Sequence, residues 1–153
     1  MANITLNIAK GRIVEFYHRV KNNDPANCAF LLIPIQTTGL ETDAVLRDKD
    51  TLADFLVGTT DEQITMGRKI LTDVELAVIP APDDSGDKFQ VSLPTTTYVA
   101  AAGNPISKFL VAFDYDTTSG TDATIVPCSL FDFVVTPTGV DVSVTTGPFF
   151  EAV

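Results

Sequence analysis

The stretch Asn104–Pro137, NPISKFLVAFDYDTTSGTDATIVPCSLFDFVVTP, contains two apolar runs that flank one polar loop. The runs, KFLVAF at 108–113 and TIVPCSLFDFVV at 124–135, are rich in β-branched and aromatic residues, which is typical of strands. The loop between them, Asp114–Ala123, is rich in Asp, Thr, Ser and Gly. Two such runs in sequence most often pair antiparallel, so the stretch predicts a long hairpin at the centre of the fold.

Short apolar or alternating runs separated by turn residues surround this hairpin. Upstream, NCAFLLIPIQ at 27–36 predicts a buried strand. Pro34 should place that strand at a sheet edge or at a bulge, since proline cannot donate to a ladder. We expect further strands at 64–71, 74–79, 89–93 and 140–144, a loop over 80–88 and a turn over 136–139. A helical turn is an open alternative over 64–71.

The best helix candidate is Ile8–Asn22, which the turn residues before Pro25 should end. Its apolar residues recur at spacings of three and four and predict one buried stripe: Ile13, Phe16, Tyr17 and Val20. The opening ITLNI alternates, so a short strand that runs into the helix is an open alternative. A second, short helix is expected over Asp48–Val57, with Asp48 or Asp50 as its N-cap.

The order of these elements predicts the fold class. A chain of 153 residues with 45% apolar and 20% charged residues should form a single domain, 1–153. We expect an N-terminal helical segment over about residues 1–58 and a β-rich body over about residues 63–153. The predicted fold is α+β: an antiparallel β-sandwich or barrel-like sheet with an N-terminal amphipathic helix and a second short helix.

The formal charge of −10 is unevenly distributed. Met1–Lys21 carries four basic residues, Lys10, Arg12, Arg19 and Lys21, against the single acidic Glu15. This segment is either a solvated helix face or a surface for an acidic partner. The acidic body should repel nucleic acid, so we expect no nucleic-acid partner. Because no run of about 18 apolar residues or secretory pattern occurs, we also expect no membrane partner and synthesis in the cytoplasm.

Residues that could carry catalysis are few. His18 is the only histidine, and no GxSxG or Cys-His signature accompanies it. Cys28 and Cys128 lie inside apolar runs, which predicts two buried thiols rather than a zinc site. The abundant carboxylates are flanked by turn formers, as in solvated loops. We therefore expect a protein that is not an enzyme, with no catalytic residue and no cofactor.

The polar loop Asp114–Asp122 invites a calcium interpretation. An EF-hand loop needs Gly at its sixth position and Glu at its twelfth. Counted from Asp114, those positions hold Ser119 and Ile125. We therefore expect no metal, and a loop held by turns that the Asp side chains make with their own main chain.

The two adjacent aromatics near the C-terminus, Phe149 and Phe150, cannot both face one side of a strand. Either the tail folds into a buried corner, or one ring is offered to a neighbouring chain. Gly147 and Pro148 before them predict a bend rather than a ladder.

Several segments together resemble small virion proteins of tailed bacteriophages. They are the amphipathic N-terminal segment, KNNDPANCAFLLI at 21–33, TLADFLVGTTDE at 51–62, DYDTTSGTDATIVPCSLFDFVVTP at 114–137 and the aromatic tail. The resemblance covers most of the chain and implies a capsid decoration (cement) protein. Such a protein is β-rich and non-catalytic, binds the major capsid protein on the outer shell, and clamps neighbouring capsomers, often as a trimer.

The resemblance leads us to expect a structural protein on the virion's capsid surface and a homo-oligomer, with a trimer favoured. From the residues themselves we expect Lys10, Arg12, Arg19 and Lys21 to steer the protein toward an acidic capsid surface, and Phe149 and Phe150 to supply apolar contacts. The alternative is another virion component, such as a tail tube, connector or head-fibre base protein. A carbohydrate-binding module is disfavoured because the chain has no Trp.

Overall fold

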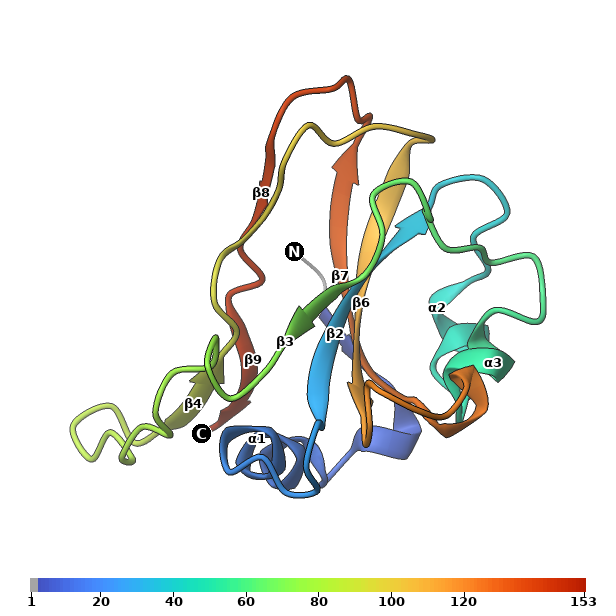
Figure 1. Ribbon diagram of the computed structural model, residues 1–153. Helices are drawn as coiled ribbons and strands as arrows, with labels where there is room; N and C mark the ends of the chain where they lie inside the picture. Colours follow the sequence, from blue (N-terminus) through green and yellow to red (C-terminus); the bar gives the residue numbers. More distant parts are fainter. Residues whose placement is uncertain (1–2) are drawn as a thin grey trace.

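In the computed structural model, which describes residues 3–153, a five-stranded antiparallel sheet runs through the middle of the molecule (Figure 1). Its strand order is β1-β7-β6-β2-β3. The bounds of these strands are Asn3–Thr5 (β1), Ala29–Gln36 (β2), Lys69–Leu71 (β3), Ile106–Asp114 (β6) and Val126–Val135 (β7). The predicted hairpin over 104–137 is therefore confirmed as β6 and β7, and it lies at the centre of the sheet.

Shorter elements cover the two faces of this sheet. Two-stranded sheets pair β4 (Phe89–Ser92) with β9 (Pro148–Ala152) and β5 (Thr96–Tyr98) with β8 (Val142–Val144). The helices are α1 (Ile13–Lys21), α2 (Asp43–Leu46) and α3 (Leu52–Phe55), with 3-10 turns η1 (Asn7–Ala9) and η2 (Asp122–Thr124). The predicted α+β class with antiparallel sheets is confirmed, and the arrangement is sandwich-like.

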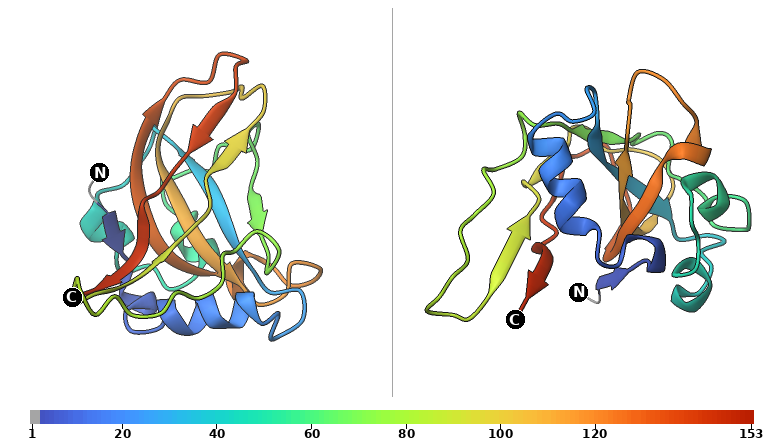
Figure 2. Two further views of the ribbon diagram at one scale, coloured as in Figure 1. Left: turned by 90° about the vertical axis from the view of Figure 1, so that its left-hand side faces the viewer. Right: turned by 90° about the horizontal axis from the view of Figure 1, so that it is seen from below.

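Side chains alternate across β2 and feed two separate cores. Phe30 and Leu32 point into a larger core that α1 and the two small sheets close. Leu31 and Ile33 point to the opposite face, where α2 and α3 cover them with buried residues such as Leu52. Figures 1 and 2 show these helices on one side of the sheet and β4, β5, β8 and β9 on the other. The period-two alternation of a strand explains how one apolar run supplies both cores.

A bulge in β7 reverses this alternation. The register with β6 pairs Ser129 with Val111 and Pro127 with Ala112, which leaves Cys128 as an extra residue. Cys128 consequently faces the larger core, whereas Leu130, two residues later, faces the smaller one. Both cysteines are free and buried, as predicted.

The N-terminal helix is shorter than expected. The stripe Ile13, Phe16, Tyr17 and Val20 is buried as predicted, but the helix begins at Ile13 rather than Ile8. Gly11 has φ +79°, a left-handed conformation that interrupts the helical path before α1. The alternative interpretation of ITLNI was right, since β1 pairs with β7 at the sheet edge.

Pro34 does not put β2 at an edge. The strand is interior, but β3 pairs only with Phe30–Leu32, so Pro34 lies beyond the end of that pairing. There the Pro34 carbonyl accepts a hydrogen bond from the Gln63 N–H at 2.8 Å. A register shift toward β6 follows between Ile35 and Gln36. The predicted irregularity is therefore present one residue later, while the predicted edge position is wrong.

The segment between β2 and β4 departs most from the predicted elements. The second helix is confined to α3, where Thr51 rather than Asp48 or Asp50 is the cap: its Oγ1 accepts from the Asp54 N–H at 3.0 Å. An additional helix, α2, precedes it. Only 69–71 of the predicted strand 64–71 forms, and 74–79 is not a strand. Glu75 explains part of this, because its carboxylate accepts from the Thr72 N–H and hydroxyl and closes a turn. The alternative of a helical turn fits the start of 64–71, where the Gly67 N–H donates to the Gln63 carbonyl at 3.2 Å.

The N-terminal part of the chain is not a separate layer. β1 and β2, both within the segment 1–58 that was expected to be mainly helical, pair with β7 and β6 of the body. At the other end of the chain, Pro148 opens β9 instead of preventing a ladder, and pairs with Ser92. Proline is tolerated as the first residue of a strand.

Candidate interaction surfaces

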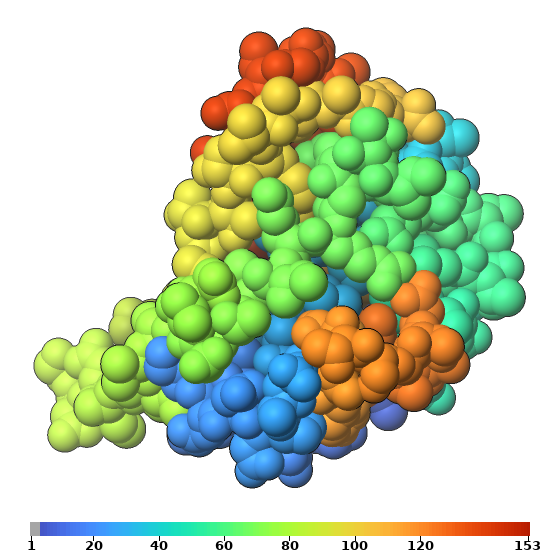
Figure 3. Space-filling view, viewed as in Figure 1, coloured from blue at the N-terminus to red at the C-terminus, as the bar shows by residue number. Residues whose placement is uncertain are grey.

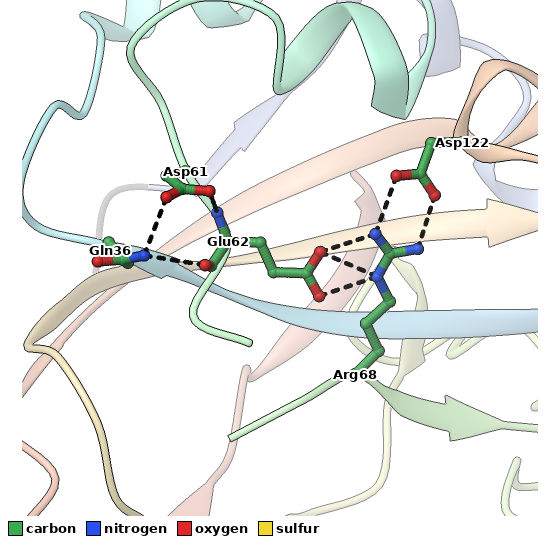
Figure 4. Close-up of polar contacts among 5 residues, drawn as sticks. All are labelled: Gln36, Asp61, Glu62, Arg68 and Asp122. Carbon is green, nitrogen blue, oxygen red and sulfur yellow. Dashed lines mark hydrogen bonds and ion pairs between the residues drawn. The ribbon is translucent and has the colours of Figure 1, made fainter. Parts of the chain in front are cut away.

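Arg68 joins two segments that are distant in sequence (Figure 4). Its guanidinium donates to Glu62 at 2.7–3.0 Å and to Asp122 at 2.8 and 3.1 Å. The Glu62 side chain is 9% exposed, so this carboxylate depends on Arg68 as its ionic partner. The hydrogen bonds from Arg68 lower the pKa of Asp122. This cluster fastens the β6–β7 loop to the segment that precedes β3.

The same segment is held to β2 by a second set of bonds. The Gln36 side-chain amide donates to the Asp61 carboxylate at 3.2 Å and to the Glu62 carbonyl at 3.0 Å, as Figure 4 shows. The backbone adds a bond from the Gln36 N–H to the Asp61 carbonyl at 2.9 Å. These contacts fix the chain where it turns toward β3.

The β6–β7 loop is stabilised by its own carboxylates. Asp114 accepts from the Asp116 N–H, and Asp116 from the Thr118 N–H, each at 3.0 Å. The predicted Asp side-chain turns are thus confirmed. A polar hollow of about 240 Å³ lies against this loop and Arg68. In the described part of the chain, no group of three or more His, Cys, Asp or Glu residues is arranged to hold a metal ion.

The predicted basic residues do not form one free patch. Arg12 and Arg19 both reach Glu15, with N–O distances of 3.6 and 2.8 Å. The hydrogen bond from Arg19 lowers the pKa of Glu15. Lys21 donates to two backbone carbonyls at 2.7 and 2.8 Å, and Lys10 donates to Asn7 at 2.6 Å. The charges remain at the surface, but all four side chains are held by carboxylate or carbonyl oxygens.

The two C-terminal aromatics have different positions. Phe149 is buried, and its ring packs edge-on against Phe30 with centroids 5.0 Å apart. Phe150 is half-buried and packs against the same core. For Phe149, the buried corner is thus the alternative that the structure shows, and its ring is not at the surface. Phe150 keeps an exposed side.

An arm projects from the body at the β4–β9 end (Figures 1 and 3). Its tip is the predicted loop, in which every residue of Pro80–Asp87 is exposed. Paired backbone bonds between Asp83 and Lys88, at 2.8 and 3.2 Å, close its base. Asp84 and Asp87 add further acidic groups to the tip. A two-stranded ribbon has little stability of its own, so the arm gains most from a neighbour that packs on it.

A groove of about 340 Å³ lies between β3 and β5. Its walls are Lys69, Ile70 and Leu71 on one side and Pro94–Thr97 on the other, with Glu75 at the rim. Figure 3 shows the hollow between the green segment that includes β3 and the yellow segment that includes β5. Among residues 3–153, β3 pairs only with β2 and β5 only with β8, so both walls present an unpaired strand edge.

The groups considered for catalysis are dispersed. His18 is exposed on α1, whereas burial raises the pKa of both the Cys28 and the Cys128 thiol. A thiol with a raised pKa is a poor nucleophile at neutral pH. No helix in the part of the chain that the structure describes is both long enough and apolar enough to span a bilayer.

Comparisons with known proteins found no match to any family model, curated protein or solved structure. The groove and the Arg68 cluster were not anticipated from the sequence. The segment Gly67–Leu71 carries Arg68 and Lys69 next to each other before two apolar residues, which was its only local signal. Their partners come from distant parts of the chain.

Proposed function

We propose that this chain is a structural virion protein that binds the outer surface of a tailed-phage capsid and stabilises contacts between capsomers. The observation that carries the proposal is the projecting arm: its base, with Val91 and Phe149, belongs to the larger core, whereas its tip, residues 80–87, is exposed throughout and projects from the body (Figure 3). An arm of this kind extends the reach of a small domain across a boundary between neighbouring subunits. The sequence resemblance to phage virion proteins supports the same role.

The mechanism rests on repetition. Each copy offers several modest surfaces: the arm, the basic side chains of α1, the exposed side of Phe150 and the open strand edges. On a symmetric lattice such contacts act together, and the effective concentration of the second contact replaces high affinity at the first. We propose a homo-oligomer, with a trimer favoured, because three arms around one axis would reach three neighbouring capsomers.

The test uses shells assembled from the major capsid protein of the same virus. The purified chain is mixed with unexpanded and expanded shells, and the copies bound per shell are counted after sedimentation. Saturable binding in a fixed ratio, with a higher melting temperature of the shell, is the expected result. Absence of saturable binding to either shell contradicts the proposal, and hexameric rings of the free chain would favour a tail-tube role instead.

A pair of arm variants separates shape from charge. Replacing residues 84–87 with Asn-Gly keeps the closing pair of Asp83 and Lys88 and shortens the tip to a two-residue hairpin turn. We expect this variant to fold normally and to bind shells at least about tenfold more weakly. The matched control changes Asp84 and Asp87 to Asn at full length, so that it loses the same two charges. This control should bind shells nearly as well as the wild type if the arm contributes through its length. If the shortened variant also binds like the wild type, a role of the arm in shell binding is excluded.

A further inference from the structure

The groove between β3 and β5 exposes main-chain groups of β3. On the β3 side of β2, Pro34 accepts from Gln63, and Gln36 donates to Asp61. Main-chain N–H and C=O groups alternate sides along an antiparallel strand, so those of Leu32 and Phe30 also point toward β3. Leu31 and its partner Ile70 are then the non-hydrogen-bonded pair of that ladder. The N–H and C=O of Ile70 consequently point away from β2 and into the groove.

Lys69 places a positive charge in the same groove. Its ammonium lies 5.2 Å from the centroid of the ring of Tyr98, the last residue of β5. Tyr98 is buried beside the groove and donates its hydroxyl to the Leu32 carbonyl at 2.9 Å, which ties β5 to β2. In the described residues, the ion pairs involve Arg12, Arg19, Arg68 and Lys108 but not Lys69. Glu75 is occupied by Thr72.

We infer that this groove binds an extended segment of a partner polypeptide, which adds a strand to β3 and places a carboxylate against Lys69. Main-chain bonds to Ile70 would supply the recognition of an extended backbone, as in other cases of strand addition. The half-exposed Ile70 side chain, 51% exposed, favours a β-branched neighbour on the outer face. The segment is therefore acidic at one position and rich in Val, Ile or Thr beside it.

A second copy of this chain fits the groove less well. Pairing of two β3 edges about Ile70 would set Lys69 opposite Leu71 and leave the ammonium without an anion. In addition, β5 stands across the groove from β3, so the space suits one strand rather than the edge of another folded sheet. The identity of the partner as a capsid protein rests on the proposed function. The binding of an acidic extended segment to the groove is independent of the proposed function.

The test uses the acetylated and amidated heptapeptide Thr-Val-Thr-Glu-Thr-Val-Thr, with a Lys-centred peptide as its control. Amide chemical shifts of the ¹⁵N-labelled full chain are recorded during titration with each peptide. We expect the Glu peptide to shift the Ile70 and Thr96 amides and to bind about tenfold more tightly than the Lys peptide. No binding, or shifts confined to other surfaces, overturns the inference.

Two variants with one control test the contacts. Ile70→Pro removes the outward N–H, which an edge strand tolerates, together with the branched side chain, whereas Ile70→Val keeps the N–H and a branched side chain. The proline variant should lose about tenfold in peptide affinity and the valine variant should bind like the wild type. Lys69→Glu should reverse the preference and favour the Lys peptide. This reversal decides the matter if Ile70→Pro fails to fold, and an unchanged preference overturns the inference.

Shell binding by the same variants separates the groove from the proposed function. Loss of both peptide and shell binding in Ile70→Pro supports a capsid segment as the occupant. If peptide binding is lost and shell binding is intact, the groove serves a different partner and the capsid as its occupant is rejected. Concentration-dependent shifts of the Ile70 amide without peptide would identify a second copy as the occupant and overturn the inference.

Discussion

Arg68 and Asp122 are 54 positions apart in the chain, yet two guanidinium nitrogens of Arg68 donate to the two carboxylate oxygens of Asp122. This paired geometry joins the segment before β3 to the loop of the central hairpin. Since Glu62 occupies the other side of the same guanidinium, Arg68 is the one cation that both carboxylates share in the cluster that Figure 4 shows.

Replacing Arg68 with Met should destabilise the fold by about 3 kcal/mol, because removal of one partner leaves the nearly buried Glu62 carboxylate without compensation. Arg68→Lys should lose less, since it keeps the charge but not the paired hydrogen bonds. Urea unfolding monitored by circular dichroism measures both changes. Equal losses in the two variants would show that the planar guanidinium has no special role.

Asp122 should make stability depend on acidity. Arg68 holds the pKa of this carboxyl below its usual range, so the stabilisation is complete above about pH 4 and disappears as pH falls through the lowered pKa. Asp122→Asn removes the effect. The stability difference between wild type and variant should therefore be constant from pH 6 to 8 at no more than about 1 kcal/mol, because Asp122 is partly exposed.

The pH comparison is made on the difference between the two proteins and not on either alone. Other carboxyls whose pKa values are lowered, such as Asp83 and Asp116, titrate equally in both and cancel. The difference should shrink toward zero below about pH 4. A difference that stays constant down to pH 3 contradicts the role of the Asp122 charge.

Phe149→Ala should cost about 3–5 kcal/mol of unfolding free energy, as expected for loss of a buried aromatic ring. Phe150→Ala should cost clearly less, because its ring is half-buried. Guanidinium unfolding of the two single variants provides the comparison. If the two losses were equal, the distinction between a buried and a half-buried ring at these adjacent positions would be wrong.

The basic side chains of α1 should act mainly on the rate of association. Arg12→Glu combined with Arg19→Glu should slow binding to capsid shells, most strongly at low salt, because exposed charges act over a Debye length. Glu15→Gln provides the matched change of opposite sign. It removes the anion that both arginines contact and should speed association.

These kinetics are measured by light scattering or by surface-immobilised shells at several salt concentrations. The helix ion pairs that the variants lose are worth only about 0.3–0.5 kcal/mol each. Because Arg12→Glu also removes the 3.1 Å hydrogen bond from Arg12 to the Tyr115 hydroxyl, circular dichroism first checks that the variants are folded. Association rates that are unchanged in both variants would reject the steering role of α1.

Local patterns in the sequence determined the hairpin β6–β7, the buried stripe of α1, the two buried thiols and the Asp turns of the polar loop. Each of these depends on periodicity or on hydrogen bonds between residues a few positions apart, such as Asp116 with Thr118. The same local logic failed over 64–79, where apolar residues suggested strands, and at the start of α3, where Asp48 or Asp50 was expected as the cap. The Glu75–Thr72 turn and the capping of α3 by Thr51 depended on geometry that residue types alone leave ambiguous.

Tertiary structure alone decided the candidate interaction surfaces. The pairing of Arg68 with Asp122, the burial of Phe149 against Phe30 and the groove between Lys69 and Thr96 each join residues that are distant in the chain. A strand pattern shows that an edge exists but not which strand will cover it, because the chain's route between strands depends on how all the apolar faces pack at once. The unpaired edge of β3 is therefore a property of the folded molecule, although every residue in it was visible in the sequence.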